Sequence, residues 1–114
     1  MDCIFCKISR GEIPSEKIFE NENFFSVFDI NPKVRGHCLI ISKKHFENVL
    51  DTPISLGSEL LDCIKKTSLK ILKDYGSSGF NLVQNNFESA GQVVKHFHIH
   101  LIPRKDKDCF KILE

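Results

Sequence analysis

The sequence predicts a small α+β fold with roughly five antiparallel strands, one long helix and one short helix. Short apolar segments, bounded by Gly, Pro and polar residues, recur along the chain and have the composition of strands. Only residues 52–75 keep the three- and four-residue apolar spacing of a long amphipathic helix. Most predicted strands follow one another without an intervening helix, which favours an antiparallel sheet.

The first half of the chain contains the short helix and three strands. Residues 4–9 carry apolar side chains at helical spacing and predict a helical turn that ends by Gly11. Residues 17–20 and 23–28 flank a polar pair and predict a hairpin. Residues 37–42 predict the third strand.

The second half begins with the long helix over residues 52–75. Gly76 is expected to end it, and its lysine-rich face is interpreted as solvated. Residues 79–85 and 96–103 then predict the last two strands. The whole chain, residues 1–114, is expected to form one domain.

Composition limits the partners and the compartment. Hydrophobic residues make up 41% and charged residues 27%, which is typical of a soluble globular protein. A net charge of +1 gives no general attraction to nucleic acid or to an anionic membrane, so we expect neither as a partner. An odd count of five cysteines, no membrane-length apolar run and no recognisable signal peptide lead us to expect a cytoplasmic protein.

Three of the five histidines alternate along one predicted strand. His96, His98 and His100 share one face, because successive side chains of a strand point to opposite sides, and the apolar residues between them face the core. Three unrelated surface histidines would be a coincidence. Two functional interpretations remain open at this point, a metal site and a histidine nucleophile supported by its neighbours.

The segment His-Phe-His-Ile-His-Leu-Ile, residues 96–102, resembles the His-φ-His-φ-His-φ-φ signature of the histidine-triad (HIT) family. Other segments agree in the family's order and resemble its Hint branch, the small nucleoside phosphoramidate hydrolases: residues 3–8, 12–14, 29–32, 36–41 and 43–45. The resemblance implies a HIT-like fold whose sheet continues across a homodimer. The strand over residues 79–85 has no Lys, Pro or acidic residue to protect an exposed edge, which favours such pairing.

The resemblance also implies catalytic roles. His98, the middle histidine, would attack the α-phosphorus and form a nucleotidyl-histidine. His100 would hydrogen-bond the leaving group and help to deliver a proton. His96 and the fourth histidine, His37, would hold the network and fix tautomers. No cofactor would be required for this catalysis.

The same resemblance implies a purine nucleotide site, of AMP or GMP type. Asp29 would accept hydrogen bonds from the two ribose hydroxyls. The base would contact apolar residues and the phosphate would meet the loop near the triad, together Ile4, Phe5, Ile8, Phe28, Ile30, Asn85, Gly91, Gln92, Val93, Val94, His98 and His100. The chain departs from the family at Phe87, where glycine is common, so loop shape and leaving-group preference are open.

Cys3 and Cys6 form a Cys-x-x-Cys pair. Alone, this pair also fits two packed cysteines or a redox pair. The resemblance implies a structural zinc ion held by the pair together with His45 and His96, a closed Cys₂His₂ set. Cys38 and Cys63 are expected to be packed in the core.

These observations lead to one function with two alternatives. We expect release of a nucleoside 5′-monophosphate from a phosphoramidate or similar adduct through nucleotidyl-His98. The alternatives are a dinucleoside polyphosphate hydrolase and a nucleotide- or zinc-binding regulator with little turnover.

Overall fold

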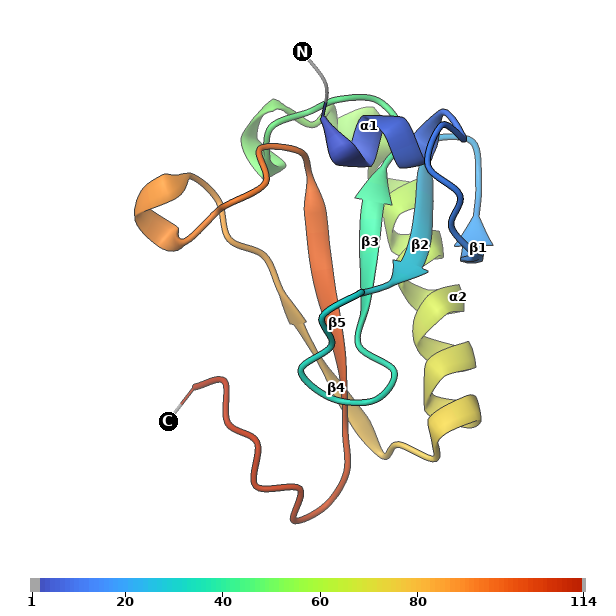
Figure 1. The fold of residues 1–114 in the computed structure, drawn as a ribbon, viewed down its shortest axis with the longest axis vertical. Helices are drawn as coiled ribbons and strands as arrows, with labels where there is room; N and C mark the ends of the chain where they lie inside the picture. The colour runs from blue at the N-terminus through green and yellow to red at the C-terminus, as the bar shows by residue number, and fades with distance from the viewer. Residues whose placement is uncertain (1–2, 114) are drawn as a thin grey trace.

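The computed structural model describes residues 3–113, so both ends of the predicted domain 1–114 lie outside the described residues. Among these residues, five antiparallel strands form one sheet in the order β1-β2-β3-β5-β4 (Figure 1). With one short and one long α-helix, this confirms the predicted α+β class. The strands are β1 (Lys17–Glu20), β2 (Phe24–Phe28), β3 (Cys38–Ser42), β4 (Gly79–Val83) and β5 (His98–Arg104).

The long helix α2 (Gly57–Tyr75) packs against one face of the sheet (Figure 1). Strand alternation places Ile40 of β3 and Leu101 of β5 on this face, where both are fully buried with Ile71 of α2. Each such side chain contributes roughly 1.5–3 kcal/mol to folding through burial. This core fixes β5 and therefore the position of the histidines on its other face.

The opposite face is covered only in part, by the short helix α1 (Ile4–Ser9) at one end of the sheet (Figure 1). Phe5 of α1 packs on Phe25, Leu39 and Ile41, which are the alternate residues of β2 and β3. A six-residue helix is too short to cover the whole face. The middle of the sheet is therefore left beside a cavity on this side.

The prediction that the long helix begins at residue 52 was wrong. Thr52 is extended, with ψ of 125°, because the residue before a proline avoids the α region. Two 3-10 turns, η1 (Val49–Asp51) and η2 (Ile54–Leu56), occupy this segment, and α2 starts at Gly57. The predicted end is confirmed, because Gly76 takes the left-handed conformation with φ of 63°.

Four predicted strands also have shifted ends. The segment at 96–103 pairs only from His98, because the Phe97 amide donates to the Phe46 carbonyl at 2.7 Å instead of joining the ladder. The predicted strand 79–85 ends at Val83, where the chain turns into the loop that carries Asn85. Strands β2 and β3 each begin one residue later than predicted. The Asn23 amide donates to Asn21 Oδ1 at 3.3 Å and the His37 amide to the Val34 carbonyl at 3.1 Å, so neither joins the ladder.

No helix within residues 3–113 has both the length and the apolar character that crossing a membrane requires.

Candidate active site

A cavity of about 570 Å³ lies between α1, the sheet and the loop that precedes β5. Its size suits a drug-sized or nucleotide-sized ligand. All the residues predicted to contact the nucleotide line it. The predicted residues that line the cavity are Ile4, Phe5, Ile8, Phe28, Asp29, Ile30, Asn85, Gly91, Gln92, Val93, Val94, His98 and His100. Val27, Lys33 and Leu39, which the sequence analysis did not indicate, also line it.

His98 is held in one tautomer by the backbone. Its Nδ1 lies 2.7 Å from the carbonyl oxygen of His96, and a carbonyl can only accept, so Nδ1 carries the proton. The lone pair of His98 is therefore on Nε2. The ring of Phe5 meets the His98 ring edge to face at 5.1 Å, which fixes its orientation beside the cavity. Neutral His98 thus has a nucleophilic nitrogen available.

His37 and His100 form a hydrogen-bonded pair whose tautomers are also fixed by the backbone. The backbone amide of Lys33 donates to His37 Nδ1 at 3.0 Å, so the proton of neutral His37 is on Nε2. That Nε2 lies 2.9 Å from His100 Nδ1, which must then accept. His100 consequently carries its own proton on Nε2. One backbone amide in this way sets the tautomers of two rings.

Asp29, at the end of β2, adjoins this pair. Its Oδ1 accepts from the Asn31 amide at 2.9 Å, while Oδ2 lies 3.5 Å from His37 Nε2 and 3.9 Å from His100 Nδ1. Burial lowers the pKa of His37, and the Asp29 carboxylate opposes that shift. Burial, with the nearby His98 and His37, lowers the pKa of His100 to about 4. Both rings are neutral at pH 7.

The loop before β5 is held by the buried side chain of Gln92. Its Oε1 accepts from the Phe87 amide at 2.7 Å, and its Nε2 donates to the Glu47 carbonyl at 2.6 Å and the Val94 carbonyl at 3.2 Å. The Gln92 amide itself donates to the Phe87 carbonyl. Gln92 therefore lines the cavity, but its polar groups shape the loop.

Phe87 takes a conformation that is normally reserved for glycine, with φ of 73° and ψ of 159°. The Phe87 residue is 47% exposed. The loop therefore keeps the backbone shape that a glycine would allow, at a cost of about 1–3 kcal/mol. Gly91, which ends the following turn, has φ of 92° and lies against the Asn85 amide, where a Cβ would be 3.4 Å away.

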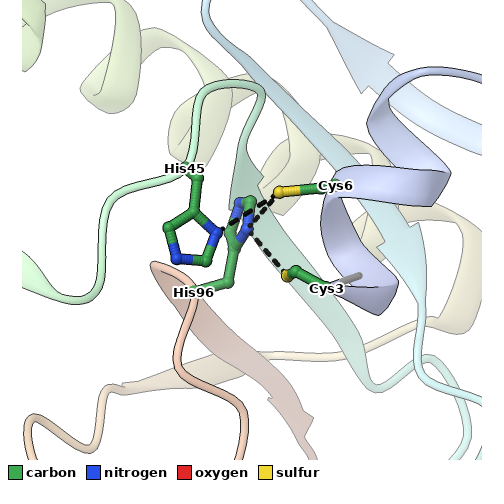
Figure 2. A group of neighbouring side chains, drawn as sticks. All are labelled: Cys3, Cys6, His45 and His96. Carbon is green, nitrogen blue, oxygen red and sulfur yellow. Dashed lines mark hydrogen bonds between the residues drawn. The ribbon is translucent and has the colours of Figure 1, made fainter. Parts of the chain in front are cut away.

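The four predicted metal ligands come together at one end of the sheet (Figure 2). Cys3 is the residue just before α1 and Cys6 lies in that helix. His45 lies in the loop after β3, and His96 lies just before β5. Their sulfur and ring nitrogen atoms all lie within 4.8 Å of one another. His96 Nδ1 is 3.2 Å from Cys3 Sγ, and His45 Nδ1 is 3.3 Å from Cys6 Sγ.

This cluster fits a metal ion. His96 Nε2 donates to the Ser42 carbonyl at 2.7 Å, which leaves the lone pair on Nδ1, toward the two sulfur atoms. A carbonyl on the far nitrogen is the usual support of a metal-binding histidine. Burial lowers the pKa of His96 to about 4, so the ring is neutral and able to coordinate. Burial and the adjacent Cys3 raise the pKa of the Cys6 thiol, a cost that a bound cation would remove.

Asp29, His37 and His100 also place three ligand-type atoms close together. They fit a metal ion poorly, because the Lys33 amide occupies His37 Nδ1 and keeps a proton on Nε2, the atom that would have to bind. The hydrogen bonds to the histidine rings therefore give the two clusters different chemical properties. One offers lone pairs to a cation, and the other holds protons.

Sequence reasoning missed the groups that decide this difference. The Lys33 amide and the Ser42 carbonyl belong to the backbone, so no side-chain pattern could have indicated them. His37 and His96 do not line the cavity but lie behind it, 2% and 0% exposed. Cys38 and Cys63 are buried in the core, as expected.

Comparisons with known proteins agree with the motifs. The family model described as "HIT domain" matches residues 10–107. The chain is 45% identical over 108 residues to "Adenylylsulfatase HINT3" of Arabidopsis thaliana, covering 95% of this chain and 55% of that protein. It is 42% identical over 109 residues to "Adenosine 5'-monophosphoramidase HNT1" of Candida albicans, covering 92% of this chain and 72% of that protein.

A solved structure supports the fold. The Zn-bound histidine triad family protein from Mycobacterium smegmatis superposes with a TM-score of 0.89 at 33% identity, over 97% of this chain and 81% of that one. The chain thus spans about half the length of the Arabidopsis relative and most of the other two proteins. Its family match covers well over half of its residues, and the chain belongs to the histidine-triad (HIT) family.

Proposed function

We propose that this protein releases a nucleoside 5′-monophosphate from a phosphoramidate or similar adduct through a covalent nucleotidyl-His98 intermediate. The observation that carries the proposal is the hydrogen bond from His98 Nδ1 to the His96 carbonyl, which leaves Nε2 as a nucleophile beside a nucleotide-sized cavity. The two relatives named above, a monophosphoramidase and an adenylylsulfatase, support release of an adenine nucleotide.

The chemistry needs two steps. His98 Nε2 bonds to the α-phosphorus while the bond to the leaving atom breaks, and the His96 carbonyl stabilises the positive charge that develops on the ring. His100 presents an N–H to the leaving atom. Water then cleaves the new nitrogen–phosphorus bond. These histidines and the backbone dipoles of the loop supply the proposed catalysis, for which we expect no cofactor requirement.

The cavity is suited to a purine nucleotide. Apolar side chains of α1 and β2, including Ile4, Phe5 and Phe28, would enclose a base, and such contacts do not distinguish adenine from guanine. Asp29 lines the same cavity and can accept hydrogen bonds from ribose. Within the described chain the amides of Val93 and Val94 have no hydrogen-bond partner, so they are available to a phosphate.

The proposal is tested by trapping the intermediate. Brief reaction with adenosine 5′-phosphoramidate, a quench in base and intact-mass analysis should reveal one adenylyl group, and peptide mapping should place it on His98. His98→Ala should lose the adduct and lower kcat at least about a thousandfold, while AMP affinity stays within about tenfold. Full turnover by His98→Ala would remove His98 as nucleophile.

The same assay separates the alternatives. Adenosine 5′-phosphoramidate and a diadenosine polyphosphate are offered at equal concentration, and the initial rates are compared. A preference for the second substrate would favour the polyphosphate hydrolase. Tight AMP binding without turnover of either substrate would favour a regulator.

We also propose that Cys3, Cys6, His45 and His96 hold a structural zinc ion. The donor set and the Ser42 carbonyl behind His96 support this assignment, and the related mycobacterial protein is described as zinc-bound. When bound, zinc would fasten α1 to the start of β5. Cys3 and Cys6 flank two residues of the cavity wall, so the ion would support the base site without taking part in the reaction.

We further propose that the single domain assembles as a homodimer through β4. This strand is an edge of the sheet, and it exposes Phe80 by 38% and Leu82 by 45%. Unpaired edges with apolar side chains tend to associate. Leu82→Lys should convert a dimer to a monomer in sedimentation velocity and reduce activity. A wild type that is a fully active monomer at micromolar concentration would contradict the proposal.

A further inference from the structure

Asp29 lies next to both the proposed ribose site and the His37–His100 pair. Its carboxylate lines the cavity, yet Oδ2 is also the acidic oxygen nearest the ring nitrogens that join His37 to His100, at 3.5 and 3.9 Å. A carboxylate offers about four acceptor positions, and the Asn31 amide uses one of them. Asp29 can therefore accept from ribose and from the histidine pair at the same time.

The histidine pair needs an acceptor when it takes up a proton. Protonated His100 carries hydrogen on Nδ1 as well as Nε2, so Nδ1 then faces the N–H of His37 across 2.9 Å. His37 cannot move its own proton to Nδ1, because that atom faces the N–H of Lys33. Two N–H groups then converge with no lone pair between them. Among residues 3–113, Asp29 is the only carboxylate with an ion-pair contact to these rings.

We propose that Asp29, beyond binding ribose, is the counter-charge that allows the His37–His100 pair to carry the proton delivered to the leaving group. This inference rests on the proposed function. Asp29 is thus a positioning residue, acting through His100 on the reacting bond.

The proton balance closes over both steps. As the phosphorus–nitrogen bond of the substrate breaks and His98 bonds to phosphorus, the leaving nitrogen takes the proton from His100 Nε2. His100 is then neutral, with its remaining proton on Nδ1 toward Asp29 and a lone pair on Nε2. That lone pair takes a proton from the water that attacks phosphorus and displaces His98. The protonated pair is restored and the nucleotide is released.

Electrostatics support this role. The groups that face the pair are Asp29 at the end of β2, Lys33 in the following loop and His98 on β5. Burial and the two histidine neighbours lower the pKa of His100, Lys33 lowers it further, and only Asp29 raises it. The anionic phosphate of a bound substrate adds to the effect of Asp29, so the pair gains its proton when the substrate arrives.

The test compares Asp29→Asn with the wild type on adenosine 5′-phosphoramidate and on its 2′,3′-dideoxy analogue. The analogue has no ribose hydroxyls, so a purely ribose-binding Asp29 would leave its hydrolysis unchanged. We expect kcat on the analogue to fall about tenfold or more, and the alkaline limb of the kcat profile to move to lower pH by about one unit. An effect confined to KM for the ribose substrate would overturn the inference.

A matched control and a second readout complete the test. Asp74→Asn removes the same charge from an exposed pair with Lys70 on α2 and should change neither profile. Histidine ring-nitrogen NMR of AMP-bound protein should show the pKa of the His37–His100 pair about one unit lower in Asp29→Asn. An unchanged pKa would overturn the inference. This titration remains decisive even if the wild type hydrolyses no phosphoramidate, an outcome that would reject only the proposed function.

Discussion

The molecule contains two clusters built around buried histidines. In one cluster the histidine ring offers a lone pair, and in the other it offers a proton. In one, His96 donates from its far nitrogen to the Ser42 carbonyl and presents a lone pair to Cys3 and Cys6. In the other, His37 accepts at its far nitrogen from the Lys33 amide and presents a proton to His100. Both rings are buried. The difference shows that a single backbone group behind a histidine determines whether the ring suits a metal ion or a proton.

The largest expected effect is a loss of activity on substitution in the His37–His100 cluster but not in the zinc cluster. His100→Gln should lower kcat by about 10² to 10⁴, because the proton donor to the leaving group is lost, with bound zinc unchanged. His45→Gln is the reciprocal variant, expected to lose zinc and nearly keep kcat. Steady-state rates and elemental analysis of the same preparations make the comparison. Loss of activity in both variants, with both folded, would mean that the clusters act as one site.

A smaller effect is expected at the cysteine pair. Cys3→Ser should weaken zinc binding by more than the roughly 10–100-fold typical of losing an outer partner, and should lower the melting temperature, because α1 loses its attachment. Cys109→Ser, at an exposed cysteine outside both clusters, is the control. Competition with a chelator measures the affinity. Unaltered zinc content in Cys3→Ser would show that the cysteine pair does not hold the ion and is only packed in the fold.

The smallest effect is the pH dependence of stability. The pKa values of His37 and His100 are lowered by burial, so the folded state disfavours their protonation. The contribution of His100 to stability is complete above about pH 6.5 and is lost as the pH falls from there toward about 4, and that of His37 changes in the same direction. From His100 we expect a loss of at most about 3 kcal/mol between these limits, reduced by the partial exposure of its ring. Urea unfolding of wild type and His100→Gln should show a shallower pH dependence in the variant.

Much of the fold was predictable because it depends on local patterns. The bounds of α1 and β1, and the shared face of His98 and His100, follow from spacing alone. The start of α2 was wrong because the restriction imposed by Pro53 outweighed an apolar periodicity. The sequence predicted which residues line the cavity, but not which ring nitrogens of the histidines carry protons. Tautomers depend on backbone groups that reach each ring only after folding.

Phe87 has a consequence for how this loop tolerates sequence change. The unfavourable φ is imposed by Gln92, which holds the Phe87 amide, so any L residue at position 87 would bear nearly the same strain. Substitutions among non-glycine residues there should therefore be almost interchangeable in backbone energy, and only glycine should relieve it. We therefore expect substitutions at positions 87 and 92 to be epistatic. Once Gln92 is replaced, the backbone is free to relax, and the advantage of glycine at position 87 should disappear.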